Sequence, residues 1–181
     1  AGGYLSYENI SDRAIVAGVE VEIRKNLFVR PLSSAANGMN KLSFGLNGSY
    51  IYTNAKMPLA TVTTGSQLEG AAPWIVNFDL SHNFTKGERS FVNTLVLNYV
   101  SDKIYTIGTQ GYQDIMEQGV LTLDFVSQAK LNKHLSLNLK ARNLLNPSYK
   151  LSRKANENGE KVILNDYKKG INISLGVSCT F

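Results

Sequence analysis

The sequence predicts an all-β fold of antiparallel, up-and-down strands that cross a membrane as part of a β-barrel. Three observations support this. Apolar residues alternate with polar ones, several alternating runs reach about 10 residues, and short connections between the runs alternate with long ones. Successive side chains of a strand point to opposite faces, so alternation describes a strand with one apolar and one polar face. About seven or eight such strands fit into the 181 residues.

Seven windows of the chain show the alternation. In these windows 33 of 36 positions in one register are apolar, against 7 of 36 in the other, and a helix does not produce that contrast. The windows are 15–24, 42–53, 72–81, 91–100, 121–130, 135–142 and 170–181. In chain order the apolar registers run from Ile15 to Ile23, Leu42 to Tyr52, Ala72 to Leu80, Phe91 to Tyr99, Leu121 to Ala129, Leu135 to Ala141 and Ile171 to Phe181. Residues Gly3 to Tyr7 are a candidate eighth strand.

The length and composition of these strands favour a membrane over a soluble β-sandwich. Soluble strands average roughly 5–6 residues, whereas membrane strands need about 9–11. The polar register is rich in Gly, Ser, Asn and Thr, as the interior of a barrel is. Aromatic residues gather toward the ends of the apolar register, where membrane interfaces favour them. They are Tyr50, Tyr52, Trp74, Phe84, Phe91, Tyr99 and Phe181.

The connections predict an orientation. Thr85–Arg89 and Asn132–Lys133 are short, whereas Asn54–Ala71, Ser101–Gln118 and Leu144–Lys168 are long. Outer-membrane barrels have short periplasmic turns and long external loops, so the last strand is expected to end at the periplasmic rim. The segment from Phe28 to Lys41 is the exception, because it is expected on the periplasmic side and is long.

Composition and motifs argue against other classes of function. The net charge of +5 is modest, and the most basic stretch, 150–169, also carries acidic residues, so no nucleic-acid groove is expected. His82 and His134 lack partners at metal spacing, and interface positions are expected for both. Glu20 and Glu22 are expected to line a solvated or salt-bridged wall. On the same register, cross-strand pairs or contacts with a plug domain are expected for Asp79, Asp124, Lys140 and Arg142. The sequence therefore predicts no enzyme, no catalytic or metal site and no cofactor, and it identifies no ligand-binding residue.

Five motifs resemble, in order, the late barrel strands of TonB-dependent outer-membrane receptors. They are Gly18–Arg24 (GVEVEIR), Leu68–Trp74 (LEGAAPW), Leu97–Val100 followed by Lys103-Ile104, Asn143–Pro147 (NLLNP), and the terminal strand that ends in Phe181. Ser101 and Lys103 depart from the Gly and Arg that are common in the family. These departures leave the expected fold unchanged.

The resemblance implies a 22-stranded barrel with an amino-terminal plug domain, in the cell outer membrane. Residues 1–181 would be the C-terminal portion of that barrel, with the plug domain absent from them. The family imports scarce ligands such as iron chelates, cobalamin or glycans, using energy that TonB delivers through the plug. The implied partners are outer-membrane lipid, the barrel-assembly machinery, TonB by way of the plug, and a small-molecule ligand at the external loops. Phe181 would be the barrel-assembly signal.

Two alternatives remain at the level of the sequence. One is a complete small outer-membrane barrel of eight strands with a structural or adhesive role. The other is a soluble β-sandwich that serves as a binding module.

Overall fold

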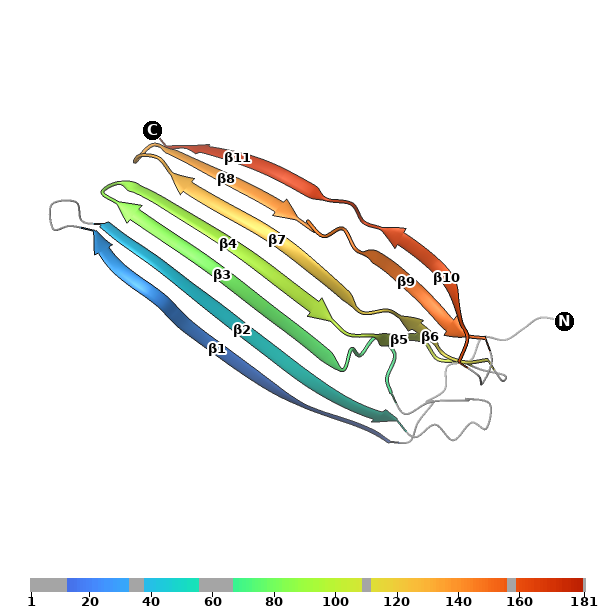
Figure 1. Cartoon of the computed structure of the whole chain (residues 1–181). Helices are drawn as coiled ribbons and strands as arrows, with labels where there is room; N and C mark the ends of the chain where they lie inside the picture. Colours follow the sequence, from blue (N-terminus) through green and yellow to red (C-terminus); the bar gives the residue numbers. More distant parts are fainter. Residues whose placement is uncertain (1–12, 33–37, 56–66, 109–111, 156–158, 181) are drawn as a thin grey trace.

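Seven long strands form one antiparallel sheet in the computed structural model, which describes residues 13–32, 38–55, 67–108, 112–155 and 159–180 (Figure 1). The strand order is β1-β2-β3-β4-β7-β8-β11. These strands are β1 (Ala14–Leu32), β2 (Gly38–Ala55), β3 (Trp74–Lys86), β4 (Arg89–Val100), β7 (Val120–Lys130), β8 (Leu135–Arg142) and β11 (Asn172–Cys179). Each corresponds to one of the seven alternating windows, so the predicted all-β antiparallel fold is confirmed. The candidate strand at Gly3 to Tyr7 lies outside the described residues.

Four short strands form a second antiparallel sheet, in the order β10-β9-β6-β5. They are β5 (Lys103–Thr106), β6 (Ile115–Glu117), β9 (Ser148–Lys154) and β10 (Lys161–Lys168). Figure 1 shows this sheet extending beyond the ends of β4, β7, β8 and β11 that lie away from the short turns. Treating Ser101–Gln118 and Leu144–Lys168 as loops throughout was therefore wrong. Their backbones pair with each other, for example through the hydrogen bond from the Gln118 amide to the Lys150 carbonyl (2.9 Å).

The connection between β1 and β2 is shorter than predicted. β1 continues to Leu32 and β2 begins at Gly38, so most of the segment from Phe28 to Lys41 belongs to strands. The pairing register shifts between Asn26 and Phe28, after which Phe28 pairs with Leu42. This β-bulge reverses which positions face the apolar side, and it therefore hid the continuing strand from a test for strict alternation.

The paired strands place their apolar registers on one continuous face. One cross-strand row joins six apolar residues across β2, β3, β4, β7, β8 and β11: Phe44, Leu80, Leu95, Phe125, Ala141 and Ile173. A row on the opposite face, three residues further along β2, is polar and joins Glu22, Asn47, Asn77, Asn98 and Thr122. The prediction of one apolar and one polar face is thus confirmed across the sheet.

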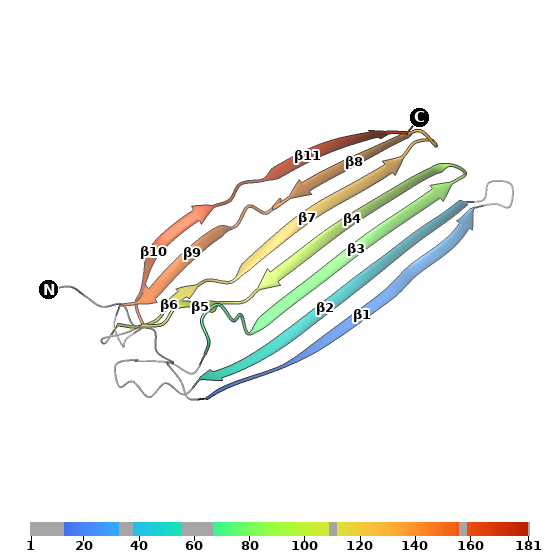
Figure 2. The same cartoon turned by 180° about the vertical axis from the view of Figure 1, so that it is seen from behind.

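The sheet is a single layer (Figure 2), and among the described residues only Ala55, Ala72, Ile104 and Val120 are buried apolar side chains. No large side chain in the described part of the chain is fully buried, and Ile173 and Leu175 are 69% and 71% exposed. A soluble sandwich buries such residues against a second sheet, which this arrangement does not provide. So much contiguous exposed apolar surface requires an apolar surrounding. No helix among the described residues is long and apolar enough to cross a membrane.

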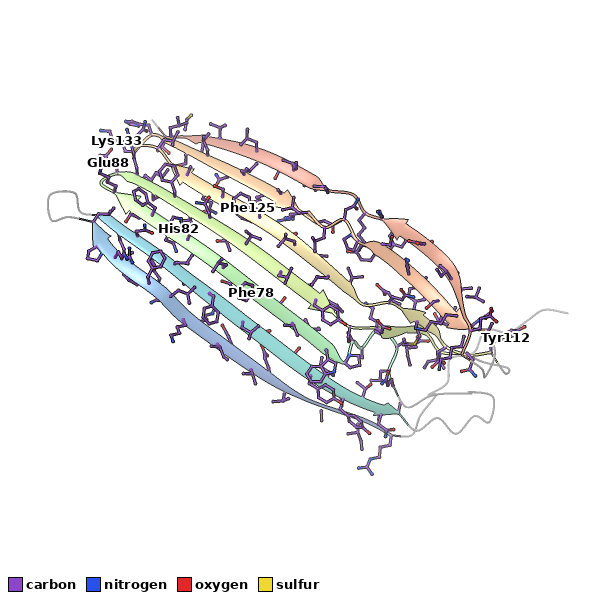
Figure 3. The ribbon with its side chains drawn as sticks, viewed as in Figure 1. Phe78, His82, Glu88, Tyr112, Phe125 and Lys133 are labelled. Carbon is purple, nitrogen blue, oxygen red and sulfur yellow. The ribbon has the colours of Figure 1, made fainter. Side chains whose placement is uncertain are left out.

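Tight connections join the long strands at one end of the sheet. Gly87 and Glu88 link β3 to β4, and Gly87 adopts a φ of 58° that glycine reaches without strain. Between β7 and β8 the side chain of Asn132 accepts hydrogen bonds from the amides of His134 and Leu135, both at 2.8 Å. Figure 3 shows Glu88 and Lys133 at this end and Tyr112 at the opposite end.

Both margins of the seven-stranded sheet are open. Among the described residues β1 pairs only with β2, and β11 pairs only with β8, so the sheet does not close into a barrel. Phe181, the expected assembly signal, lies outside the described residues.

Candidate functional site

A ladder of side-chain amides crosses the polar face. Asn98 Nδ2 donates to Asn77 Oδ1 (2.5 Å), Asn77 Nδ2 to Asn47 Oδ1 (3.4 Å), and Asn47 Nδ2 to Glu20 Oε1 (2.5 Å). Four strands, β1 to β4, contribute one residue each. Because every amide donates in the same direction, the ladder leaves Asn98 Oδ1 as its last acceptor, without a donor among the described residues.

The charged residues of β1 belong to the same wall. Arg24 Nε donates to Glu22 Oε1, and both side chains are largely exposed. Glu20 is held by Asn47 as part of the amide ladder. Glu20 and Glu22 thus lie on the exposed polar face, and Glu22 forms an ion pair, which agrees with the predicted solvated or salt-bridged wall.

The other charged residues of the polar register behave differently from the prediction. Of the two predicted roles for Asp79, Asp124, Lys140 and Arg142, cross-strand pairing is not seen as ion pairs, because within the described ranges none of the four forms one. Asp124 Oδ1 instead accepts a hydrogen bond from the Asn143 amide (2.8 Å). The Asp79 carboxylate lies over Gly45, where a Cβ atom would overlap it. The alternative, contact with a plug domain, stays a prediction.

Two asparagines set the bend between β8 and β9. Asn143 and Asn146 have φ values of 59° and 43°, a left-handed conformation that asparagine tolerates better than most residues. Asn143 Nδ2 donates to the Gly170 carbonyl (2.7 Å), and the Gly170 amide donates to Asn146 Oδ1 (3.1 Å). The bend is thereby fastened to the chain that enters β11, and it directs β9 toward β6.

Beyond this bend lies a pocket of about 210 Å³. It is on the polar face, because Asn98 and Thr122 line it. Its other lining residues include Ser101, Lys103, Glu117, Gln118, Tyr149 and Lys169. Lys103 Nζ lies 3.3 Å from Glu117 Oε2, and both side chains are about one-quarter exposed.

A second pocket of about 120 Å³ adjoins the first and shares Glu117 and Tyr149 with it. Its lining is richer in aromatic residues: Tyr105, Glu117, Tyr149, Lys150, Leu151, Asn165 and Tyr167. The rings of Tyr149 and Tyr167 stack with centroids 5.5 Å apart and planes inclined by 20°. Lys169 Nζ lies 3.8 Å from the centroid of the Tyr149 ring. Together the two cavities are called the paired pockets below.

Two other pockets are lined by described residues, and the larger of them carries Lys154 and Lys161, which have no carboxylate partner among those residues. One, of about 300 Å³, is lined by Asp102, Asp114, Lys154 and Lys161 among others. Asp102 Oδ1 already accepts from the Gly119 amide (2.6 Å), and Asp114 Oδ1 accepts from the Gly108 amide (2.8 Å). The other, of about 190 Å³, lies between β4, β7 and β8 near the short turns and is lined mostly by small polar side chains around Lys130.

The histidines and the cysteine take structural positions. His82 Nε2 bonds to Asn40 Oδ1 (2.8 Å), and His134 Nδ1 bonds to the Thr180 carbonyl (2.7 Å). Cys179 is exposed and pairs with Leu135 on the apolar register. In the part of the chain that the structure describes, no three His, Cys, Asp or Glu side chains gather closely enough to hold a metal ion.

Sequence reasoning missed the residues of the paired pockets. Tyr149, Lys150 and Tyr167 lie in the segment Leu144–Lys168, which the sequence predicts as a loop. A weak signal was present, because Tyr149, Leu151 and Arg153 alternate with Lys150 and Ser152. This alternation is weaker than that of the membrane strands, because the charged Arg153 shares a register with Tyr149 and Leu151.

Comparisons with known proteins give one match. A family model described as "TonB dependent receptor-like, beta-barrel" matches residues 1–144, which include β1 to β8. Neither the curated proteins nor the solved structures contain a match to the chain.

Proposed function

The chain belongs to the TonB-dependent receptor β-barrel family, and on that premise we propose that it forms the C-terminal part of the barrel wall of a receptor that imports a scarce ligand. Family membership makes the chain part of a transporter of the outer membrane and not an enzyme. Interaction with TonB and binding of a ligand follow from it in general terms.

The single-layered sheet with one apolar and one polar face carries this proposal. Its apolar face suits contact with outer-membrane lipid, and its polar face suits a water-filled interior. The open margins at β1 and β11 support a wall that is larger than these strands. Unpaired backbone groups cost several kcal/mol each in hydrocarbon, so further strands must pair with both margins. A 22-stranded barrel, as the resemblance implied, satisfies this requirement.

The orientation is part of the proposal. The short turns at Gly87-Glu88 and at 131–134 face the periplasm, and the four-stranded sheet with the paired pockets faces outward. Ligand then meets the external end of the wall, while a plug domain outside residues 1–181 couples the receptor to TonB. At the periplasmic rim Phe181 serves the barrel-assembly machinery as a recognition signal.

Uptake by whole cells tests the proposal. Cells that express the full-length receptor are supplied with a ferric chelate, cyanocobalamin or an oligosaccharide as the limiting nutrient, with and without functional TonB. Growth on one of these nutrients is expected to require both the receptor and TonB. Growth that is independent of both on all three nutrients would contradict coupled import.

A second experiment addresses the alternative of a complete small barrel. Residues 1–181 alone are refolded into lipid vesicles and analysed by gel electrophoresis with and without heating. A closed barrel migrates as a compact, heat-sensitive species, whereas a wall with open margins is expected to aggregate or to remain unfolded. A compact monomer would favour the eight-stranded alternative.

A further inference from the structure

We propose that the paired pockets bind a neutral oligosaccharide. The inference rests on the proposed import function and names the class of ligand. Three properties of the site carry it: exposed aromatic rings, lysines that are mostly paired with carboxylates, and a supply of neutral hydrogen-bonding groups.

The aromatic rings provide flat apolar platforms. Tyr105 and Tyr167 are 53% and 47% exposed and line the second pocket with Tyr149, which belongs to both pockets. A pyranose ring presents C–H groups on its faces and hydroxyl groups around its rim. Such a ring can lie on a tyrosine face while its rim meets polar side chains, which is how rings that are part apolar and part polar are recognised.

Two of the three lysines that line the paired pockets have a carboxylate partner, and the third has an aromatic one. Lys103 pairs with Glu117 (3.3 Å), Lys150 pairs with Asp166 (3.6 Å), and Lys169 lies over the Tyr149 ring. An anionic iron chelate is best held by cations that remain available for it. Because Lys103 and Lys150 are each paired with a carboxylate, and among the described residues only Lys169 of these three lacks one, the site favours a neutral ligand over a multiply charged anion.

Neutral donors and acceptors complete the site. Asn98, Ser101, Gln118 and Thr122 line the first pocket, and Asn165 lines the second. Asn98 is also the end of the amide ladder, which leaves its Oδ1 available to a donor such as a sugar hydroxyl. The ladder continues across the polar face through Asn77 and Asn47, so a hydroxyl-rich ligand meets amides along the wall as well.

The sizes of the paired pockets agree with a ligand built of small units. At about 210 Å³ and 120 Å³ each is smaller than the roughly 300–1,000 Å³ of pockets that enclose a drug-sized molecule. Two small adjoining pockets suit neighbouring rings of an oligosaccharide better than one bulky corrin or one large chelate.

Binding measurements on the full-length receptor test the inference. The purified receptor in detergent is applied to a glycan array and titrated calorimetrically with the best neutral oligosaccharide, with a ferric tris-catecholate and with cyanocobalamin. We expect saturable binding of a neutral oligosaccharide and none of the other two probes. Tyr149→Ala combined with Tyr167→Ala is expected to weaken that binding by about tenfold or more, because the exposed Tyr167 platform and the ring on which it stacks are both lost.

Matched variants keep the test decisive. Tyr112→Ala removes a tyrosine that is also exposed at the external end but lines neither pocket, and it should leave the affinity unchanged. Tyr149→Phe retains the ring and should bind within about twofold of the unaltered receptor, which separates stacking from misfolding. Absence of any neutral glycan ligand, or equal weakening by Tyr112→Ala, would overturn the inference. TonB-dependent import of a chelate or of cobalamin would overturn it too, while leaving the proposed function intact.

Discussion

At the scale of single residues, the side on which a side chain lies decides which substitutions the wall tolerates. Leu95 stands near the middle of the apolar row and is 41% exposed. Its neighbour Val96 points to the polar face and lies in one cross-strand row with Asp79 and Asp124. An arginine at position 95 would therefore face the apolar side, whereas an arginine at position 96 would lie beside two carboxylates.

Leu95→Arg is expected to lower the free energy of unfolding by about 2–4 kcal/mol, because it places a cation at mid-depth in the lipid. Val96→Arg is the control, and two carboxylates in its row should hold its cost below about 1 kcal/mol. Guanidinium unfolding of the receptor in lipid vesicles measures both. Equal destabilisation by the two variants would show that the apolar face does not meet lipid.

Asn143 combines an unusual backbone with a side-chain hydrogen bond, and two substitutions separate these roles. Asn143→Gly keeps the φ of 59° and loses only the bond to the Gly170 carbonyl, at a cost of about 0.5–1.5 kcal/mol. The buried Oδ1 of Asn143 has no partner among the described residues, which places this cost toward the lower end. Asn143→Ala should cost about 1–2 kcal/mol more, because a Cβ atom opposes the left-handed conformation. Guanidinium unfolding in lipid vesicles measures the free energy of unfolding of both variants. An alanine variant as stable as the glycine variant would contradict the backbone role.

At the scale of elements, the turns and the bulge set the registers on which the two faces depend. Gly87 occupies the first central position of the two-residue hairpin between β3 and β4 with a positive φ, whereas Glu88 does not have one. That is the pattern of a type II′ turn, whose twist matches that of the flanking strands. A slip of one residue here would turn an entire strand over.

Gly87→Ala is expected to destabilise the hairpin by about 1 kcal/mol and to lower the yield of folded receptor. Glu88→Ala, one residue further along the same turn, should change the stability by less than about 0.5 kcal/mol. The fraction of receptor that shows heat-sensitive migration after refolding into vesicles reports the difference. If Glu88→Ala lowered that fraction as much as Gly87→Ala, the turn type would not be the cause.

At the scale of the whole molecule, the two ends of the sheet face different compartments. The β9–β10 hairpin lies at the end with the paired pockets, and the β7–β8 turn lies at the other (Figure 1). Glu160 and Lys133 are exposed residues in these two connections. Cys179 is the single cysteine of residues 1–181, and the labelling background replaces it by alanine together with any cysteine elsewhere in the full-length receptor.

In that background, Glu160→Cys is expected to react with a membrane-impermeant maleimide on intact cells. Lys133→Cys should react only after the outer membrane is opened, because its turn faces the periplasm. Gel-shift analysis of the labelled receptor measures both. Labelling of Lys133→Cys but not Glu160→Cys on intact cells would reverse the proposed orientation.

The sequence alone determined the parts of this protein that depend on local pattern. Alternation located all seven long strands and the two faces of the sheet, because side-chain direction repeats every two residues whatever the neighbouring strand is. It also placed Glu20 and Glu22 on the polar wall. The bulge after Asn26 defeated the same test, because one extra residue exchanges the two registers.

Only the tertiary structure revealed the short strands and the paired pockets, because both depend on pairing between segments that are distant in the sequence. β5, β6, β9 and β10 have little alternation of their own and exist because their backbones pair with each other. The paired pockets likewise unite Asn98, Glu117, Tyr149 and Tyr167 from four different strands. Periodicity records the face on which a side chain lies, whereas a site is set by the registers between strands, which the chain acquires only on folding.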